Sequence, residues 1–373
     1  MDPQSQFCPN PDCAARGRVG EGNIKTHSHK ERRYRCRVCK RTFSANMGTV
    51  FYRLQTTAAV VTIVLALLSH GCPLQAIVVA FGLDERTVTD WWLKSGQHSR
   101  QVHEHLVAAG GVQLAHVQAD ELWVKLAGAR AWLAMAIAVP SRLWLGGVVS
   151  QRRDLVLITS LVAMVRACAA SLAVLVCVDG LASYVTAFLS VFRHALSRNG
   201  RVGRRKLVVE EGLLLAQVVK RHVQRRLVSV ERRIVRGTGE AIARVLRDTG
   251  TGSVINTAYI ERLNATFRAF LPALVRRGRA IVHTEVLLNA GVYLVGCTYN
   301  FCLHHSSLRL LAPAGSQRQW QERTPAMAAG LTDHCWSLVE LLSYKVPLPA
   351  WVAPKRRGRP PKRRSAPAMA REA

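Results

Sequence analysis

Two apolar runs that lead into aspartates constrain the fold more than any other feature of the chain. The run GVQLAHVQA precedes Asp120, and the run SLAVLVCV precedes Asp179. Runs rich in Val, Leu and Ala are typical of strands buried in a sheet. A third acid, Glu261, lies in NTAYIERLNATFR, which has the pattern of a helix. Buried carboxylates are costly unless they are paired or bind a cation, so the three acids predict a divalent-metal site.

The charge balance points to a polyanionic partner. The chain has 373 residues, with 52 Lys and Arg against 23 Asp and Glu, giving a formal net charge of +29. Such a balance favours nucleic acid or an anionic membrane surface. The most apolar stretches, 58–68 and 131–139, are shorter than the roughly 20 residues that a spanning helix needs. The start MDPQSQFCPNPDC lacks the features of a secretory signal, so we expect a cytoplasmic protein with no membrane partner.

Four of the ten cysteines lie near the N-terminus in two pairs, Cys8-x4-Cys13 and Cys36-x2-Cys39. Paired thiolates at this spacing can complete one tetrahedral structural Zn²⁺ site, and a segment this short has little core of its own. Four buried thiols or two disulfides are the alternatives. His27 and His29 are expected to be surface residues. We predict a zinc ribbon over residues 1–48.

The next segment, 49–110, has the pattern of helices. Helices are expected over Thr57–Ser69, Pro73–Phe81 and Glu85–Lys94, with a turn at Gly82. Two helices joined by a tight turn containing Gly match a helix-turn-helix. The third helix would then place Arg86, Thr87 and Lys94 in the major groove. A helical bundle that does not touch DNA is the alternative.

Strands follow from Gly111. We expect strands over 112–126, 131–139 and 142–149, a helix over 154–170, a strand over 171–178 and a helix over 182–196. The order β-β-β-α-β-α is the core order of the ribonuclease H-like fold, an α/β mixed sheet flanked by helices. Ligands of open α/β sheets bind at the carboxyl ends of strands, and Asp179 lies at such an end.

A basic insertion near 198–250 separates the second acid from the third. Alternating Val and Arg from Val218 to Val235 predict a β-hairpin with one basic face. A short helix is expected over 241–246, and Asn256 or Thr257 can begin the helix of Glu261. On that helix Glu261, Asn264 and Arg268 share one face, which offers a carboxylate, an amide and a guanidinium to a metal and a phosphate. A solvated helix would look similar in isolation.

Several of these segments resemble the transposases of IS1-type insertion sequences: RYRCRVCKRTFS after the knuckles, QADELW, INTAYIERLNATFRAFLPALVRRGRA and YNFCLHHSSLR. The resemblance covers about residues 8–309, with a departure at Leu303, where an arginine is expected. It implies a zinc ribbon, a helix-turn-helix and a ribonuclease H-like domain with a DDE triad of Asp120, Asp179 and Glu261. Two Mg²⁺ or Mn²⁺ ions held by the triad would serve metal-dependent DNA cleavage and strand transfer.

The resemblance also implies partners: double-stranded DNA of the element ends and the target, and at least one further copy of the chain. Arg276 and Arg277, which follow the helix of Glu261, are expected to contact DNA. Glu121 is expected on the opposite side of its strand from Asp120, so it is not expected to be a metal ligand and could instead form a salt bridge with the basic hairpin. A DNA-binding regulator without catalytic activity is the alternative function, and a nuclease acting on RNA hybrids is a third.

The C-terminal sequence PKRRGRPPKRR, residues 354–364, resembles an AT-hook, in which Arg357 and Arg359 would reach into the minor groove. A generic basic tail is the alternative. The chain thus divides into a zinc ribbon (1–48), a helix-turn-helix (49–110), a catalytic domain (111–310) and a tail (311–373).

Overall fold

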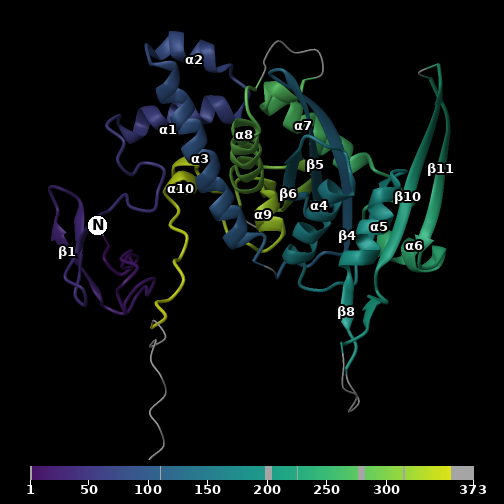
Figure 1. Cartoon of the computed structure of the whole chain (residues 1–373), viewed down its shortest axis with the longest axis horizontal. Helices are drawn as coiled ribbons and strands as arrows, with labels where there is room; N and C mark the ends of the chain where they lie inside the picture. Colours follow the sequence, from purple (N-terminus) through teal and green to yellow (C-terminus); the bar gives the residue numbers. More distant parts are fainter. Residues whose placement is uncertain are drawn as a thin grey trace, which may run out of the picture. The chain divides into compact units, whose positions relative to one another are not determined.

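The central element is a mixed sheet whose strands come from positions 116 to 236 of the chain (Figure 1). In this computed structural model, which describes residues 2–109, 111–197, 204–224, 226–275, 282–313 and 316–353, six strands form the sheet in the order β11-β10-β7-β4-β5-β6. Their bounds are β4 His116–Leu126, β5 Ala129–Ala138, β6 Leu143–Ser150, β7 Leu175–Asp179, β10 Leu214–Val223 and β11 Arg226–Arg236. Strands β4, β5 and β6 are antiparallel, whereas β7 pairs parallel with both β4 and β10.

Helices cover both faces of the sheet because its strands are apolar on both sides. Along β4, Val117 and Ala119 pack in one buried cluster with α4 (Leu155–Cys168) and α5 (Ala182–Val191). Leu122 and Val124 pack in another with α7 (Ala258–Phe270) and α8 (Glu285–Cys297). Because side chains alternate along a strand, these clusters lie on opposite faces. The predicted mixed sheet flanked by helices, with its β-β-β-α-β-α order, is confirmed.

Three helices precede the sheet: α1 (Ala58–Ser69), α2 (Leu74–Phe81) and α3 (Glu85–Leu106). Gly82 at the end of α2 has φ 60°, and the Asp84 side chain accepts hydrogen bonds from the first turn of α3. The expected third helix ended at Lys94, but α3 continues to Leu106. The continuation buries Ser95, Gly96 and Ser99, whose small size lets α3 pack closely on α8.

Residues Gly48–Val346 form one compact unit. It therefore holds the helices α1–α3, the sheet and the part of the predicted tail up to Val346, so the predicted boundaries near 110 and 310 lie inside it and remain predictions. The segment after residue 310, predicted as a tail, contains β12 (Leu310–Leu311), β13 (Trp320–Gln321), α9 (Pro325–Ala328) and α10 (Leu338–Ser343). Leu341 and Leu342 of α10 are fully buried.

The basic insertion differs in two ways from its prediction. Helix α5 ends at Val191, not near residue 196, and a short hairpin follows, formed by β8 (Arg193–Ala195) and β9 (Leu207–Val209). Strands β10 and β11 form the expected hairpin, and α6 spans Gly239–Asp248. However, Arg232 and Arg233 are consecutive in β11, so they lie on opposite faces. The prediction of one basic face is wrong.

The N-terminal residues belong to a second compact unit, whose described residues are 2–47 and 347–353. It contains a three-stranded antiparallel sheet of β1 (Ile24–Ser28), β2 (Arg33–Cys36) and β3 (Thr42–Ser44). Its small core joins Cys8, Cys13 and Cys36 to Tyr34 and Phe43. A cluster of this size buries little apolar surface, which fits a fold that a metal ion would hold.

One helical stretch, Glu285–Leu308, is long and apolar enough to cross a membrane by length and composition. It comprises α8 and the turns that follow, and the sequence survey did not single it out. In the structure 72% of its most apolar window is buried inside the protein. That placement is the one expected for a core helix, and α8 packs against α3 and β6.

Candidate metal and active site

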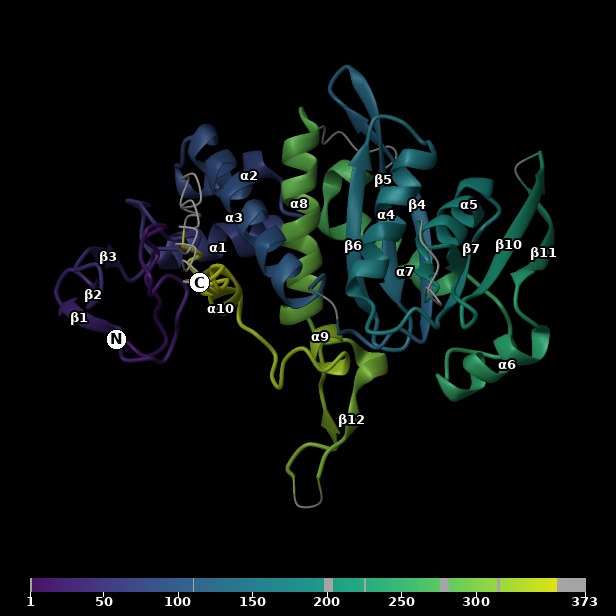
Figure 2. The ribbon, with the colours of Figure 1, turned by 60° about the horizontal axis from the view of Figure 1, so that its bottom comes forward.

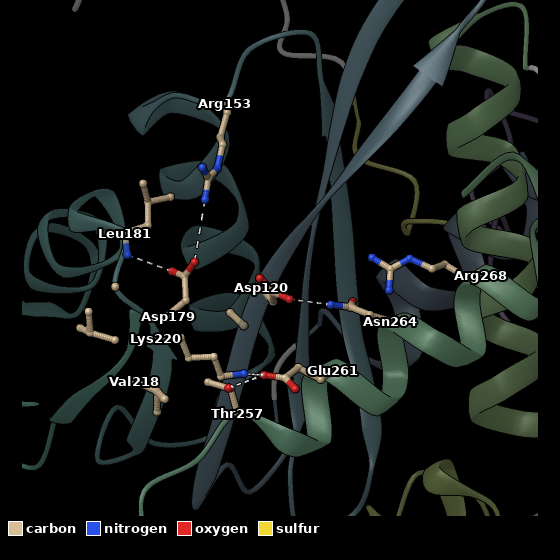
Figure 3. Close-up of a pocket in the computed structure, with 13 residues that line it drawn as sticks. Asp120, Arg153, Asp179, Leu181, Val218, Lys220, Thr257, Glu261, Asn264 and Arg268 are labelled. Carbon is tan, nitrogen blue, oxygen red and sulfur yellow. Dashed lines mark hydrogen bonds and ion pairs between the residues drawn. The ribbon is translucent and has the colours of Figure 1, made fainter. Parts of the chain in front are cut away.

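Asp120, Asp179 and Glu261 line one cavity of about 640 Å³, although they come from three separate elements (Figure 3). Asp120 lies in the middle of β4, Asp179 is the last residue of β7, and Glu261 is in the first turn of α7. The pairing of β4 with β7 runs up to Ala119 and Val178, so the next residue of each strand is an aspartate at the same level of the sheet. The register thus places the two aspartates side by side.

Asp120 is held by hydrogen bonds from its neighbours. Its Oδ2 accepts from Asn264 Nδ2 at 2.7 Å, and its Oδ1 accepts from the backbone N–H of Glu121 at 2.9 Å. Burial, followed by the negative charges of Glu121, Asp179 and Glu261, raises the pKa of Asp120 to about 7. A bound cation would relieve this repulsion, because opposite charge favours the ionised carboxylate.

Asp179 lies at the junction of β7 and α5. Its Oδ1 accepts from the backbone N–H of Leu181 at 3.0 Å, and Arg153 lies 3.8 Å from its Oδ2. Gln217 of β10 donates to its backbone carbonyl at 3.0 Å. The carboxylate is therefore oriented by the loop after β7 and remains part-exposed to the cavity.

Glu261 lines the cavity from the first turn of α7. Its Oε1 accepts from Thr257 Oγ1 at 2.8 Å and forms an ion pair with Lys220 of β10. Partial burial acts to raise the pKa of Glu261, but the hydrogen bonds from Lys220 and Thr257 hold it below its usual range. The ammonium group of Lys220 thus lies next to the carboxylate of Glu261.

Glu121 lies on the other face of β4 from Asp120, as predicted, but its carboxylate is close to the pair. One oxygen each of Asp120, Glu121 and Asp179 lies within 4.8 Å of the other two, a spacing that could hold a metal ion. However, Arg153 Nε donates to Glu121 Oε1 at 2.7 Å and Tyr184 donates to Oε2 at 2.9 Å. The suggested salt bridge of Glu121 to the basic hairpin is therefore wrong. Glu261 is outside this 4.8 Å group, although it lines the same cavity.

The face of α7 is as predicted: Glu261, Asn264 and Arg268 all line the cavity. Asn264 is 2% exposed, and its Oδ1 has no hydrogen-bond partner among the described residues. Thr257 is the N-cap residue of α7 but makes no side-chain capping bond, whereas Asn256 Oδ1 accepts from the N–H of Ala258 at the start of the helix.

Gln118 is a residue that the sequence analysis missed. It lies on the same face of β4 as Asp120 and is fully buried. Its Oε1 accepts hydrogen bonds from the N–H groups of Tyr259 and Ile260, each at 3.0 Å, and its Nε2 donates to the carbonyl of Asn256 at 2.8 Å. A side chain of β4 thus caps α7 and fixes Glu261 relative to Asp120.

The four N-terminal cysteines form a separate cluster. Cys8 Sγ lies 3.6 Å from Cys39 Sγ, and Cys13 Sγ lies 3.8 Å from Cys36 Sγ. Tetrahedral Zn–S bonds of about 2.3 Å imply sulfur–sulfur separations of about 3.8 Å, so the four thiols could hold one Zn²⁺. All four are free rather than disulfide-bonded. His27 and His29 are exposed, as expected.

The residues predicted to contact DNA differ in how far they are exposed to solvent. Arg86 is exposed at the start of α3, and Thr87 is part-exposed. The ammonium group of Lys94 instead donates to the carbonyl of Tyr52, and burial lowers its pKa, so Lys94 is directed into the protein. Four further predictions fall outside the described residues: Arg276, Arg277, Arg357 and Arg359.

Neither a protein-family profile nor a curated protein matches this sequence. The function must therefore be argued from the geometry of the cavity, the charge of the chain and the motifs quoted above.

Proposed function

We propose that the protein is a DNA transposase of an insertion sequence, which cuts and joins DNA strands at the cavity formed by Asp120, Asp179 and Glu261. The observation that carries the proposal is the meeting of these three carboxylates, from β4, β7 and α7, in one cavity of a chain with net charge +29. A basic protein attracts the DNA backbone, and clustered carboxylates are the ligands that Mg²⁺ prefers.

The carboxylates of Asp120, Asp179 and Glu261 would hold two Mg²⁺ or Mn²⁺ ions, which when bound activate the attacking oxygen and stabilise the leaving 3′-oxygen. Asn264 orients Asp120 through its 2.7 Å hydrogen bond. The pKa of Asp120 is near 7 without a cation, so a bound cation would favour the ionised form of this carboxyl. Arg268 and Lys220 line the same cavity and supply positive charge to the phosphate being transferred.

The other parts of the chain suit the same substrate. The N-terminal cysteine cluster would hold a structural Zn²⁺, and α2 and α3 would act as a helix-turn-helix on double-stranded DNA of the element ends. Joining two ends to a target requires more than one active site, so we propose at least a homodimer. We also propose that the protein acts on chromosomal DNA in the cytoplasm.

A DNA-binding regulator without catalytic activity is the second candidate. One observation favours it: Glu261 is paired with Lys220 and Asp179 lies beside Arg153, so protein cations already stand next to two of the three acids. A regulator of this kind would bind the element ends and cut nothing.

The test is incubation of the protein with duplexes carrying candidate terminal repeats, in Mg²⁺, Mn²⁺ or EDTA. The wild type should yield nicked and joined strands only with the divalent ions. Asp179→Asn should bind the duplex with unchanged affinity and yield no joined product, because it loses a metal-binding charge. Asp248→Asn, an exposed acid in α6 away from the cavity, is the matched control and should behave as wild type.

Joining by Asp179→Asn would remove Asp179 from the active site. Binding by the wild type without any product, in either metal, would support the regulator instead.

A further inference from the structure

Strands β10 and β11 form a two-stranded ribbon that extends beyond the rest of the sheet (Figure 2). The pairing of β10 with β7 ends at Val218 and Asp179, whereas β10 continues to Val223. Those five further residues correspond to about 17 Å of strand. Within this extension, β10 and β11 are paired with each other, from Val219 opposite Glu231 to Val223 opposite Arg226.

The ribbon is exposed to an unusual degree. Every residue of β11 from Arg226 to Val235 is exposed, and the strand forms the edge of the sheet. Large apolar side chains are among them: Val228 is 63% exposed and Leu227 is 54% exposed. Long exposed edge strands with apolar side chains are places where proteins pair with partners.

The charge of the ribbon indicates the kind of partner. Its two strands contain six basic residues against one acid, Glu231; the basic residues are Lys220, Arg221, Arg226, Arg232, Arg233 and Arg236. Arg221 and Arg226 make no hydrogen bond or ion pair within the described part of the chain. Two unpaired guanidinium groups near the tip of the ribbon are available to phosphates.

The ribbon is continuous with the candidate active site. Val218, Val219 and Lys220 of β10 line the cavity that contains the three acids. Lys220 and Arg232 lie on the ribbon face that is turned to the cavity, where they contact Glu261 and the carbonyl of Ile255. DNA held at the acids would therefore lie next to the base of the ribbon.

From these observations we propose that the β10–β11 ribbon is a DNA-binding arm that enters a groove of the duplex next to the strand held in the cavity. The inference rests on the proposed function, because it takes the ligand of the cavity to be DNA. The major groove is about 12 Å wide and admits a two-stranded β-ribbon. Arg221 and Arg226 contact phosphates, and exposed side chains such as Val228 contact the groove.

A second copy of the chain fits the ribbon less well. Antiparallel pairing of two β11 strands centred on Glu231 would set Glu231 against Glu231 and Arg226 against Arg236. Like charges directly opposite each other in a sheet are destabilising. The ribbon charge favours a polyanion.

The experiment measures the affinity of the full-length protein for an end duplex over a series of NaCl concentrations, without divalent ions. The test variant is Arg221→Gln/Arg226→Gln. The matched control is Arg244→Gln/Arg247→Gln, which removes the same charge from exposed positions of α6. Losing two phosphate contacts should reduce the slope of log affinity against log salt by about 1.8 for the ribbon variant. The control should keep the wild-type slope.

A second measurement does not depend on charge. A photoreactive group attached at Ser229→Cys, an exposed position of β11, should crosslink to the duplex, whereas one at Asp248→Cys should not. Equal slopes for the two double variants, or no crosslink from position 229, would overturn the proposal. A ribbon variant that sediments differently from the wild type but keeps the wild-type salt slope would also overturn the proposal, because the ribbon would then join copies of the chain.

The two proposals fail in different ways. If the wild type makes no cleaved product but the ribbon variant still lowers the salt slope, the proposed reaction fails and the DNA-binding arm stands. If the wild type cleaves DNA and the ribbon variant keeps the wild-type slope, only the arm fails.

Discussion

Among the three acids of the cavity, Asp120 is the one whose ionisation costs the most free energy. It is mostly buried and lies near the negative charges of Glu121, Asp179 and Glu261, so its pKa rises from 3.8 to about 7. In the folded, metal-free protein this group binds a proton over a pH range in which the unfolded chain has released it. The contribution of Asp120 to the free energy of unfolding is therefore fully present below pH 4, and it falls as the pH rises from about 4 to about 7.

This shift predicts the behaviour of Asp120→Asn in buffer without divalent ions. The amide cannot ionise, so the variant avoids the cost that the wild type acquires as pH rises. The free energy of unfolding of the variant relative to wild type should increase by about 1 kcal/mol between pH 6 and pH 8. Urea denaturation at both values measures it. A difference that stays constant or falls with pH would show that Asp120 has no raised pKa.

Lys220 provides a second prediction at this scale. Its ammonium group is paired with Glu261 and so competes with a metal ion for this carboxylate. The variant Lys220→Met should therefore bind Mn²⁺ more tightly, as measured by calorimetry. The gain should be at most about fivefold, because an exposed ion pair contributes at most about 1 kcal/mol. Lys206→Met, an exposed control, should bind as wild type. Weaker binding by Lys220→Met would mean that Lys220 supports the metal site and does not compete with it.

At the scale of elements, β4 and α7 are joined through one buried side chain. Gln118 satisfies two N–H groups at the start of α7, and the same helix carries Glu261 one residue later. The first N–H groups of a helix need partners from outside it. The geometry of the three acids therefore depends on a strand residue that is not itself in the cavity.

Replacing Gln118 by Met should test this dependence. The change leaves two buried N–H groups unpaired, so the free energy of unfolding should fall by about 2 kcal/mol. Strand transfer should fall further than the stability loss explains, because Glu261 is no longer fixed. Thr284→Ala removes the N-cap of α8, away from the cavity, and should cost about 1 kcal/mol with no loss of strand transfer. Equal activity in both variants would show that Gln118 only stabilises the fold.

Burial explains why some of these elements could be predicted from the sequence and others could not. Apolar runs located β4 and β7 with their aspartates, because burial of strands leaves a clear compositional pattern. The role of Gln118 could not be found in this way, since its partners are 138 to 142 residues away. The length of α3 was missed for a similar reason: beyond Lys94 it buries Ser95, His98 and Ser99, polar residues that interrupt an apolar period.

At the scale of the whole molecule, the chain consists of two compact units that are stabilised in different ways. The unit Gly48–Val346 has large apolar clusters on both faces of its sheet. The N-terminal residues share only a small cluster built around the cysteines. The cysteine spacing was enough to predict that cluster, whereas the single unit from 48 to 346 could not be foreseen, because contacts such as those of α10 with α3 join distant segments.

Removal of the Zn²⁺ that we propose for the four cysteines should therefore affect the two units unequally. In a strong chelator, amide hydrogens of β1–β3 should lose their protection from exchange, because their fold depends on the four thiolates. Protection in β4 and β7 should stay unchanged. Trp fluorescence should change little, since seven of the eight Trp residues lie in the unit Gly48–Val346. Loss of protection in β4 together with β1 would contradict the independence of the two units.

Locating Mn²⁺ in crystals of the protein by its anomalous scattering would test the three-acid site most directly. We expect at least one ion between β4, β7 and α7, about 2.2 Å from carboxylate oxygens of Asp120 and Asp179, with Glu261 moved from Lys220 to the ion. An ion bound by Asp120, Glu121 and Asp179 while Glu261 stays on Lys220 would contradict the three-acid site, and so would the absence of any ion in the cavity.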